Sequence, residues 1–252
     1  MERSAPRVVV DAAELQPGAV VALDERLGHY LRAVLRLSEG DALTVLDGAG
    51  RAFAATLGSG ALQIGAPADA ATADLAAEAP CRVEILQALP KGDKLGEIIR
   101  RATELGAWRI VPALTARTIA TAGSAQKLER WRRIAREAAR QSRRLHVPEV
   151  EAPRPLAEAM RGARGALRVL LHEAERALRL RDLLAAAPPP PAGAPRSVTI
   201  AVGPEGGFTA AEVAEAGACG FVAAGLGPRV MRTETVALAV CAVLQHVWGD
   251  LG

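Results

Sequence analysis

Two glycine-punctuated segments near the C-terminus carry the residues best suited to binding a small molecule. They read IAVGPEGGFTAAE (Ile200–Glu212) and AAGLGPRVMRTETVALAV (Ala223–Val240). Glycine admits positive φ angles and a close approach of the backbone, so such loops can wrap a ligand with main-chain groups. Short apolar runs at Val198–Val202 and Phe221–Ala223 come before the glycines, and they predict strands that end where the loops begin. We expect the two loops to converge on one ligand.

The position of these loops in the chain excludes the common nucleotide-binding patterns. No G-x-G-x-x-G follows the first strand of the α/β part, and no G-x-x-x-x-G-K-[ST] phosphate loop is present. An ordinary Rossmann methyltransferase would also carry its glycine loop after the first strand. Here both loops come near the end of the chain, which favours a different α/β architecture.

Composition sets the outer bounds of the interpretation. The chain has 252 residues and is 50% hydrophobic, enough to fill the core of one large or two modest domains. It has no apolar run of about 18 residues and no signal-peptide pattern at its start, so we expect a cytoplasmic protein that does not enter a membrane. The three cysteines, Cys81, Cys219 and Cys241, lie far apart and suit neither a disulfide framework nor a metal knuckle. We therefore expect no bound metal.

Positive charge is concentrated in one segment. The formal net charge is +3 and the pI is near 9.0, which favours a polyanionic partner. From Lys127 to Arg144 there are eight basic residues against two acidic ones, and an apolar stripe at helical spacing runs through the segment. These features predict an amphipathic helix. Its basic face is either an ordinary solvated surface or a contact surface for an RNA backbone.

The distribution of short strands and helices predicts two domains. Residues 7–64 contain several short strand-like runs separated by turn signals and one helix near Leu27–Leu37, a pattern typical of a small β-barrel. The acidic, low-complexity stretch Ala66–Ala79 is expected to be a linker. Strands and helices then alternate, which predicts a mostly parallel sheet covered on both faces. The expected domains are residues 1–70 and 80–252.

Five motifs in the same order resemble those of the RsmE family of SPOUT (trefoil-knotted) RNA methyltransferases. They are His29–Arg36 followed by Gly40-Asp41, QALPKGDKLGEIIRRATELG (Gln87–Gly106), the block Trp131–Val150, GPEGG (Gly203–Gly207), and LGPRVMRTETVAL (Leu226–Leu238). The resemblance covers almost the whole chain. It implies a PUA-like small β-barrel followed by a SPOUT α/β domain with a mostly parallel sheet, a C-terminal trefoil knot and dimerisation through the knotted region.

The resemblance also implies an activity and a set of binding residues. Members of this family use S-adenosylmethionine to methylate N3 of a uridine in small-subunit (16S) ribosomal RNA. The implied partners are ribosomal RNA, within the assembled small subunit, and a second copy of the chain. The residues expected to bind the cofactor are Leu171, His172, Gly203, Pro204, Glu205, Gly206, Gly207, Leu226, Gly227, Arg229, Val230, Met231 and Thr233.

The chemistry of the target defines the expected catalytic residues. Uridine N3 bears a proton at neutral pH and attacks well only as that proton leaves, so the enzyme needs a base or a donor that stabilises the anion. Arginine is a poor base but a good donor to a developing anion. We expect Arg232, helped by Arg144, to stabilise the anion, and Glu205 to organise the loop or accept the proton. The expected RNA contacts are Arg7, His29, Arg32, Arg36, Lys91, Lys94, Arg136, Arg140 and Arg144.

Two alternatives stay open at this stage. Another SPOUT activity, such as methylation of a ribose 2′-oxygen in RNA, would use the same cofactor loops with different residues facing the target. A non-catalytic RNA-binding or ribosome-assembly protein could have kept the fold without the reaction. Identification of the modified nucleotide separates the first alternative, and binding of S-adenosylmethionine separates the second.

Overall fold

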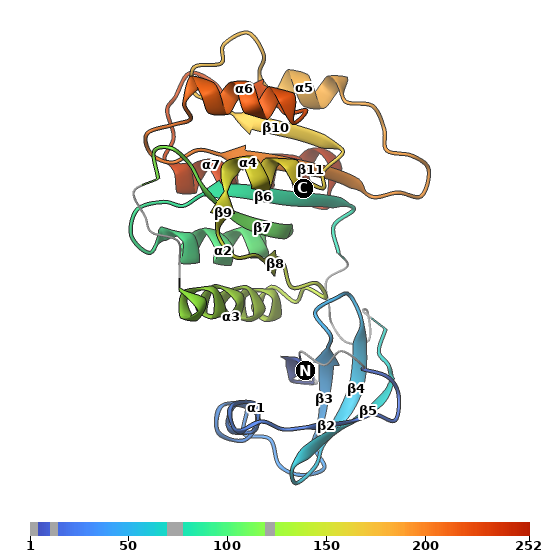
Figure 1. Ribbon diagram of the computed structural model, residues 1–252. Coiled ribbons are helices and arrows are strands. Elements are labelled where there is room, and N and C mark those ends of the chain that lie inside the picture. Colours follow the sequence, from blue (N-terminus) through green and yellow to red (C-terminus); the bar gives the residue numbers. More distant parts are fainter. Residues whose placement is uncertain (1–4, 11–14, 70–77, 119–123) are drawn as a thin grey trace. The chain divides into compact units, whose positions relative to one another are not determined.

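The computed structural model describes residues 5–10, 15–69, 78–118 and 124–252, which divide into two compact units (Figure 1). The first unit comprises residues 1–78 and 139–147, and the second comprises residues 79–138 and 148–252. The short segment 139–147 joins the first unit because Ala49 and His146 form a β-bridge and the Val147 amide donates to the Gly48 carbonyl at 2.9 Å. In the described part of the chain, no helix is long and apolar enough to span a bilayer.

The first unit is a five-stranded sheet with one short helical segment. The strand order is β1-β3-β4-β5-β2; β1 pairs with β3 in parallel, and the other pairs are antiparallel. Five short strands in this region agree with the expectation from the sequence. The elements are β1 (Arg7–Val9), β2 (Val20–Ala22), α1 (Glu25–His29) with a π-helical turn at Tyr30–Val34, β3 (Ala42–Leu46), β4 (Ala52–Leu57) and β5 (Ala61–Pro67).

Two boundaries in this unit differ from the prediction. The helix begins at Glu25 rather than Leu27, because the Asp24 carboxylate accepts a hydrogen bond from the Leu27 amide at 2.6 Å and caps the first turn. Strand β5 runs on to Pro67, so the predicted linker at Ala66–Ala79 begins in a strand. Most of the rest of that linker, residues 70–77, lies outside the described residues.

The second unit is built on a sheet in which every strand pair is parallel. The order is β12-β10-β11-β6-β7-β8, and β9 pairs with β7 beside β8. This confirms the predicted mostly parallel α/β sheet, whereas the trefoil knot stays a prediction. The strands are β6 (Cys81–Ala88), β7 (Ala107–Leu114), β8 (Glu149–Val150), β9 (Arg154–Pro155), β10 (Leu167–Leu171), β11 (Arg196–Val202) and β12 (Val222–Ala224). The helices are α2 (Lys94–Glu104), α3 (Ala125–Gln141), α4 (Leu156–Arg161), α5 (Leu180–Ala186), α6 (Ala210–Ala218) and α7 (Thr233–Trp248).

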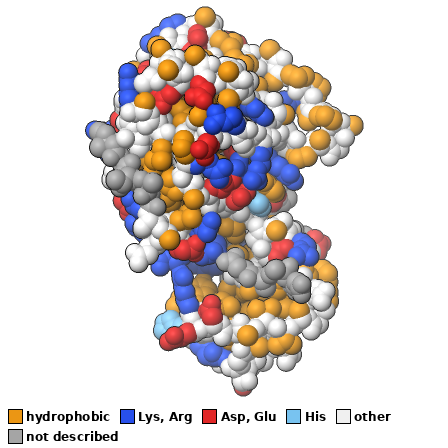
Figure 2. Space-filling model, in the orientation of Figure 1, with side chains coloured by type: hydrophobic (Ala, Val, Ile, Leu, Met, Phe, Trp, Pro, Cys, Tyr) orange, Lys and Arg blue, Asp and Glu red, His pale blue; other side chains and the backbone are white. Residues whose placement is uncertain are grey.

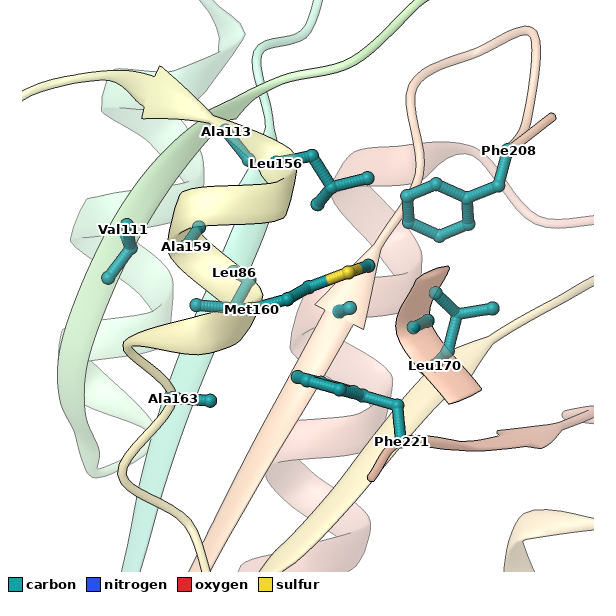
Figure 3. Packing of buried hydrophobic residues seen from close by; sticks show 12 residues of the cluster. Leu86, Val111, Ala113, Leu156, Ala159, Met160, Ala163, Leu170, Phe208 and Phe221 are labelled. Atoms are coloured by element: carbon teal, nitrogen blue, oxygen red, sulfur yellow. The ribbon is translucent and has the colours of Figure 1, made fainter. Parts of the chain in front are cut away.

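Helices cover both faces of this sheet. Helix α7 packs against α2, β6 and β11, and α4 packs against α6, β6 and β7; Figure 1 shows α4 in front of the sheet and α7 behind it. Under α4, Figure 3 shows the Met160 side chain reaching into the core, with the rings of Phe208 and Phe221 on either side. Phe208 directly follows the first glycine loop, so this core also anchors the loop to the sheet.

A buried ionic network ties the middle of the sheet together. The Arg109 guanidinium, only 4% exposed, donates to the carboxylates of Glu84 and Glu151, and the Thr199 hydroxyl donates to Glu84 as well. Burial lowers the pKa of the Arg109 guanidinium to about 10. The side chains come from β6, β7, β11 and the residue after β8, so the network links four segments of the sheet.

Candidate ligand-binding site

One cavity lies at the carboxyl ends of three neighbouring strands of the second unit. Strand β10 lies between β11 and β12, and its last residue, Leu171, pairs with Val202 on one side and Ala224 on the other. The three strands therefore end at the same level, and the loops that follow them leave the sheet at one edge. Crevices at the carboxyl ends of parallel strands are the usual binding sites of α/β proteins.

The two glycine loops and the segment after β10 form the walls of this cavity. Its volume is about 310 Å³, within the range typical of sites for small molecules. The N-terminus of α7 forms part of the wall, and every residue in the lining belongs to the second unit. The lining comprises Leu171, His172, Glu173, Val202, Gly203, Pro204, Glu205, Gly207, Leu226, Gly227, Arg229, Val230, Met231, Arg232, Thr233 and Val236.

The first glycine loop is a tight turn held from both sides. The Gly207 amide donates to the Pro204 carbonyl at 2.9 Å, and Gly207 has a φ of 69°, which favours glycine. The Gly206 carbonyl accepts a hydrogen bond from the Arg117 guanidinium. Gly206 is also the one predicted cofactor-binding residue that does not line the cavity.

The second glycine loop is held by the segment that follows β10. The His172 amide donates to the Ala224 carbonyl at 3.1 Å, the Gly225 amide donates to the Leu178 carbonyl at 2.9 Å, and Arg176 donates to the Gly227 carbonyl at 3.2 Å. These bonds hold residues 172–180 beside residues 224–227. Both walls of the cavity are therefore held by hydrogen bonds to backbone carbonyls.

The rim carries a lysine shared between two glutamates. The Lys94 ammonium lies 3.7 Å from a Glu205 carboxylate oxygen and 3.2 Å from one of Glu234. The Lys91 amide also donates to Glu205 at 3.2 Å. The pKa of the Glu234 carboxyl is lowered chiefly by its own backbone N–H, against an opposing effect of burial, with further contributions from Lys94 and Arg232. Glu234 is therefore a carboxylate at neutral pH.

Arg229 and Arg232 supply positive charge at the cavity. Both side chains line it and are exposed. Among the residues that the structure describes, no ion pair joins either guanidinium to a carboxylate, whereas Glu205 and Glu234 both pair with Lys94. The two arginines can therefore donate to a ligand that develops negative charge.

The structure brings together two of the three predicted catalytic residues. Arg232 and Glu205 both line the cavity. Arg144 lies in the first unit, where its guanidinium is buried and donates to the Glu78 carboxylate at 2.7 Å. Helix α3 ends at Gln141, so Arg144 lies beyond the helix, although the sequence predicts a helix over the segment from Lys127 to Arg144.

The predicted RNA contacts of the first unit fall into different environments. His29 and Arg36 are exposed, and Arg7 is half-buried. Arg32 donates to the carbonyls of Gly58 and Ser59 in the turn between β4 and β5. The Arg140 guanidinium stacks on the Tyr30 ring, 5.3 Å from its centroid. Arg32 and Arg140 thus have structural partners within the first unit.

In the second unit the predicted RNA contacts are Lys91, Lys94 and Arg136. Lys91 is exposed, Lys94 forms the ion pairs of the rim, and Arg136 is half-buried. Acidic and basic side chains lie interspersed on the face shown in Figure 2, in keeping with pairs such as Arg164–Glu149 at 2.8 Å. Ion pairs of this kind neutralise part of the positive charge of the second unit.

Some residues at the site escaped sequence reasoning. Glu173 and Val202 line the cavity and directly adjoin predicted residues, so their positions at the ends of β10 and β11 could have identified them. Arg117 holds the first glycine loop from 89 residues away in the chain and belongs to no glycine motif. Gln87 opens one of the recognised motifs, but nothing in the sequence indicated a contact with Thr233.

Comparisons with known proteins agree with this geometry. A family model described as an RNA methyltransferase domain matches residues 77–245, and one described as an RNA methyltransferase PUA domain matches residues 23–64. The ribosomal RNA small subunit methyltransferase E of Synechocystis sp. is 39% identical over 236 residues, which is 92% of this chain and 76% of that protein. Its counterpart from Mycobacterium bovis is 36% identical over 92% of this chain and 89% of that protein.

Two solved structures with a bound cofactor share the fold. The ribosomal RNA small subunit methyltransferase E of Neisseria gonorrhoeae, bound to S-adenosylmethionine, superposes with a TM-score of 0.82 at 30% identity and covers 98% of this chain and 100% of its own. A putative methyltransferase from Legionella pneumophila, also with bound S-adenosylmethionine, gives a TM-score of 0.81 at 30% identity and covers 98% of this chain and 99% of its own.

Proposed function

The chain belongs to the ribosomal RNA small subunit methyltransferase E (RsmE) family, and we propose that it methylates N3 of one uridine in small-subunit ribosomal RNA with S-adenosylmethionine as the methyl donor. The observation that carries this proposal is the cavity formed by three loops at the carboxyl ends of β10, β11 and β12. Relatives that align over almost the whole chain hold S-adenosylmethionine.

The residues of the cavity fit this cofactor. Its walls are mainly apolar side chains and glycine backbone, which suit an adenosine, and its volume of about 310 Å³ suits a molecule of that size. Gly203 and Gly207 let the main chain approach the ligand closely, and Leu171, Leu226 and Met231 offer apolar surface for the adenine ring. When bound, the cofactor supplies a methyl group activated by a positively charged sulfonium, so the chain must chiefly orient the two reactants.

Arg232 is the residue to which we assign stabilisation of the target base. Its exposed guanidinium stands at the cavity and has no carboxylate partner among the described ion pairs. Removing the N3 proton spreads negative charge over O2, N3 and O4 of uridine, and a preorganised donor lowers the cost of that charge. Arg232→Ala should lower kcat by about 10²–10³, with S-adenosylmethionine affinity measured alongside to separate catalysis from binding. Near-normal turnover would reject the assignment.

Glu205 is the candidate proton acceptor on the same wall. Its carboxylate accepts a hydrogen bond from the Lys91 amide and lies 3.7 Å from the Lys94 ammonium, so it is held in place at the rim. The alternative role is organisation of the loop alone. Glu205→Gln separates the two roles. If Glu205 is the general base, the variant loses the part of kcat that rises with pH. If Glu205 only organises the loop, the pH profile of kcat is unchanged. The proposed assistance from Arg144 stays a prediction. In the structure its guanidinium is paired with the Glu78 carboxylate.

Ribosomal RNA, within the assembled small subunit in the cytoplasm, is the proposed substrate. The exposed basic side chains of Arg36 and Lys91, together with the exposed His29, support phosphate contacts. Aromatic residues make up only 3% of the chain, which disfavours stacking of several single-stranded bases and favours recognition of a structured RNA. Binding should therefore weaken steeply with salt. A flat response between low and physiological ionic strength would contradict the proposed phosphate contacts.

A homodimer completes the proposal. Along α7 and just beyond it, Val243, Val247 and Leu251 are exposed, although the same helix buries its opposite face against the sheet. We propose that these residues pack against the same residues of a second copy of the chain, because an apolar stripe at helical spacing can be buried against its symmetry mate. Light scattering at micromolar concentration should give twice the monomer mass of 26.2 kDa. A monomeric mass for the wild type would reject the dimer.

Calorimetry with S-adenosylmethionine tests the cofactor assignment directly. The proposal predicts binding to the purified chain and none to a variant with a bulky side chain in the cavity wall, such as Gly227→Trp, because Gly227 lines the cavity and has no neighbouring heavy atom within 4 Å of its Cβ position. The matched control is Gly193→Trp, because Gly193 is a glycine of the same unit that has no neighbouring side chain and is absent from the cavity lining. Absence of binding to the wild type would favour a non-catalytic RNA-binding protein.

A further inference from the structure

A buried chain of hydrogen bonds links the end of β6 to both glycine loops of the cavity. The Gln87 side chain, 0% exposed, donates from Nε2 to the Thr233 hydroxyl at 2.9 Å and to the Ala88 carbonyl at 3.0 Å. The Thr233 hydroxyl in turn donates to the Gly203 carbonyl at 2.6 Å. Gln87 does not line the cavity, but Thr233 and Gly203, to which it is linked by these hydrogen bonds, both do.

The chemistry of the groups determines the direction of each bond. The Ala88 carbonyl can only accept, so the end of the Gln87 amide that faces it must be the NH₂ group. The same NH₂ group donates to Thr233, and the single proton of that hydroxyl is then left for the Gly203 carbonyl. A residue without a donor at position 87 would leave the hydroxyl free to rotate away from Gly203.

The chain of bonds joins three segments that the sequence keeps far apart. Gln87 pairs in register with Val202, the last residue of β11, and Gly203 follows immediately. Thr233 is the first residue of α7, where the second glycine loop ends. The start of the first loop is thereby fixed to the end of the second. Without the hydrogen bond from Thr233, the peptide that joins Gly203 to Pro204 could adopt many orientations, because glycine restricts the backbone little.

We propose that Gln87, acting through Thr233, is a positioning residue that holds the cofactor loop Gly203–Gly207 in its binding conformation. This inference rests on the proposed function, because it assigns the loop to the cofactor. Neither side chain needs to touch the reacting atoms. Their effect is on the affinity for S-adenosylmethionine, since an unfixed loop must be ordered each time the cofactor binds.

The chain offers a matched control in Gln245. This glutamine is also buried, at 2% exposure, and its Nε2 donates to the carbonyls of Cys81 and Gly106 at 3.2 and 3.3 Å. It lies near the opposite end of α7 from Thr233, and neither of its partners lines the cavity. Replacing Gln245 therefore removes a comparable buried amide without releasing the loop.

The experiment compares S-adenosylmethionine affinity among variants that keep side-chain volume. Gln87→Met and Thr233→Val should each raise the Kd about tenfold, as expected when a buried hydrogen bond is left unmade. Thr233→Ser, which keeps the hydroxyl, should bind within a factor of about 3 of the wild type. Gln245→Met should lose thermal stability but bind S-adenosylmethionine as the wild type does. The double variant Gln87→Met/Thr233→Val should be no weaker than either single variant, because both break the same chain of bonds.

Kinetics and hydrogen exchange supply readouts that a purely structural role would not move. Gln87→Met should raise KM for S-adenosylmethionine while kcat at saturating cofactor changes much less, and amides of residues 205–207 should exchange faster without cofactor. Wild-type affinity in folded Gln87→Met, or an equal loss in Gln245→Met, would overturn the inference. A wild-type chain that binds no S-adenosylmethionine would overturn the proposed function and this inference together.

Discussion

Replacing Gly207 with alanine is the sharpest perturbation of the cofactor loop that the structure offers. Gly207 has a φ of 69°, and a Cβ atom there would lie 2.5 Å from a carboxylate oxygen of Glu173, which lines the cavity. A non-glycine residue in this left-handed region costs roughly 1–2 kcal/mol. Gly220 is the matched control, because it has a φ of 78° in the turn between α6 and β12 and no neighbouring heavy atom within 4 Å of its Cβ position.

The two substitutions should differ in cofactor binding. In free Gly207→Ala the loop can relieve its strain by leaving the binding conformation, so the cost of roughly 1–2 kcal/mol reappears on binding and raises the Kd about 5- to 30-fold. Displacement of Glu173 adds to the loss. In Gly220→Ala the same strain lowers the melting temperature by about 2–4 °C per kcal/mol and leaves the Kd unchanged.

The assay is calorimetric titration of both variants with S-adenosylmethionine, together with thermal unfolding with and without the cofactor. The wild type and Gly220→Ala should gain the same increase in melting temperature on adding cofactor, and Gly207→Ala should gain much less. Equal affinity in the two variants would refute the reasoning, because the conformation of Gly207 would then have no part in the binding of the cofactor.

Three further predictions concern groups outside the cavity. Arg109→Met should lower the free energy of unfolding by about 3–5 kcal/mol, because the buried Glu84 carboxylate loses its partner; a loss below about 1 kcal/mol in urea unfolding would contradict the role of the network. Burial raises the pKa of the Cys81 thiol to about 11, so iodoacetamide at neutral pH should label the half-buried Cys219 first and Cys81 only after unfolding; early labelling of Cys81 would contradict this. The pKa of the Asp47 carboxyl is lowered because hydrogen bonds from Arg51 and Ala49 outweigh its burial, so its contribution to stability is present above pH 3.8 and is lost as the pH falls through the lower folded pKa. Asp47→Asn should therefore be less stable than the wild type at neutral pH, with a difference that shrinks in acid; a difference independent of pH would contradict the assigned cause.

Local sequence patterns predicted the elements whose residues face one buried surface. The strands β3 and β4 alternate or carry apolar residues along their whole length, and both lie in the strand-rich region predicted over residues 7–64. The two-residue strands β8 and β9 escaped prediction, because a pattern of two residues has no period. Helix α5 runs into an Ala/Pro-rich stretch, residues 185–192, and its apolar stripe is too short to distinguish it from a loop.

The cavity could be predicted where the chain itself carries the signal. Glycine loops directly after apolar runs identified Gly203 and Leu226, and the parallel sheet brings them together because β10 lies between the strands that precede them. Arg144 shows the limit of this reasoning. The charge and apolar pattern placed it in the predicted amphipathic helix, but the helix ends at Gln141 and the side chain pairs with Glu78. Contacts between distant segments, such as Gln87 with Thr233, leave no local pattern at all.

The most direct test of the central claim is methylation of purified small ribosomal subunits with labelled S-adenosylmethionine, followed by mapping of the modified nucleotide. The subunits should come from cells that lack this activity, so that the target is unmodified. The account predicts label on N3 of a single uridine, with transfer lost in Arg232→Ala and reduced in Gly207→Ala at limiting cofactor. Label on a ribose oxygen, or no transfer from a chain that binds S-adenosylmethionine, would contradict it.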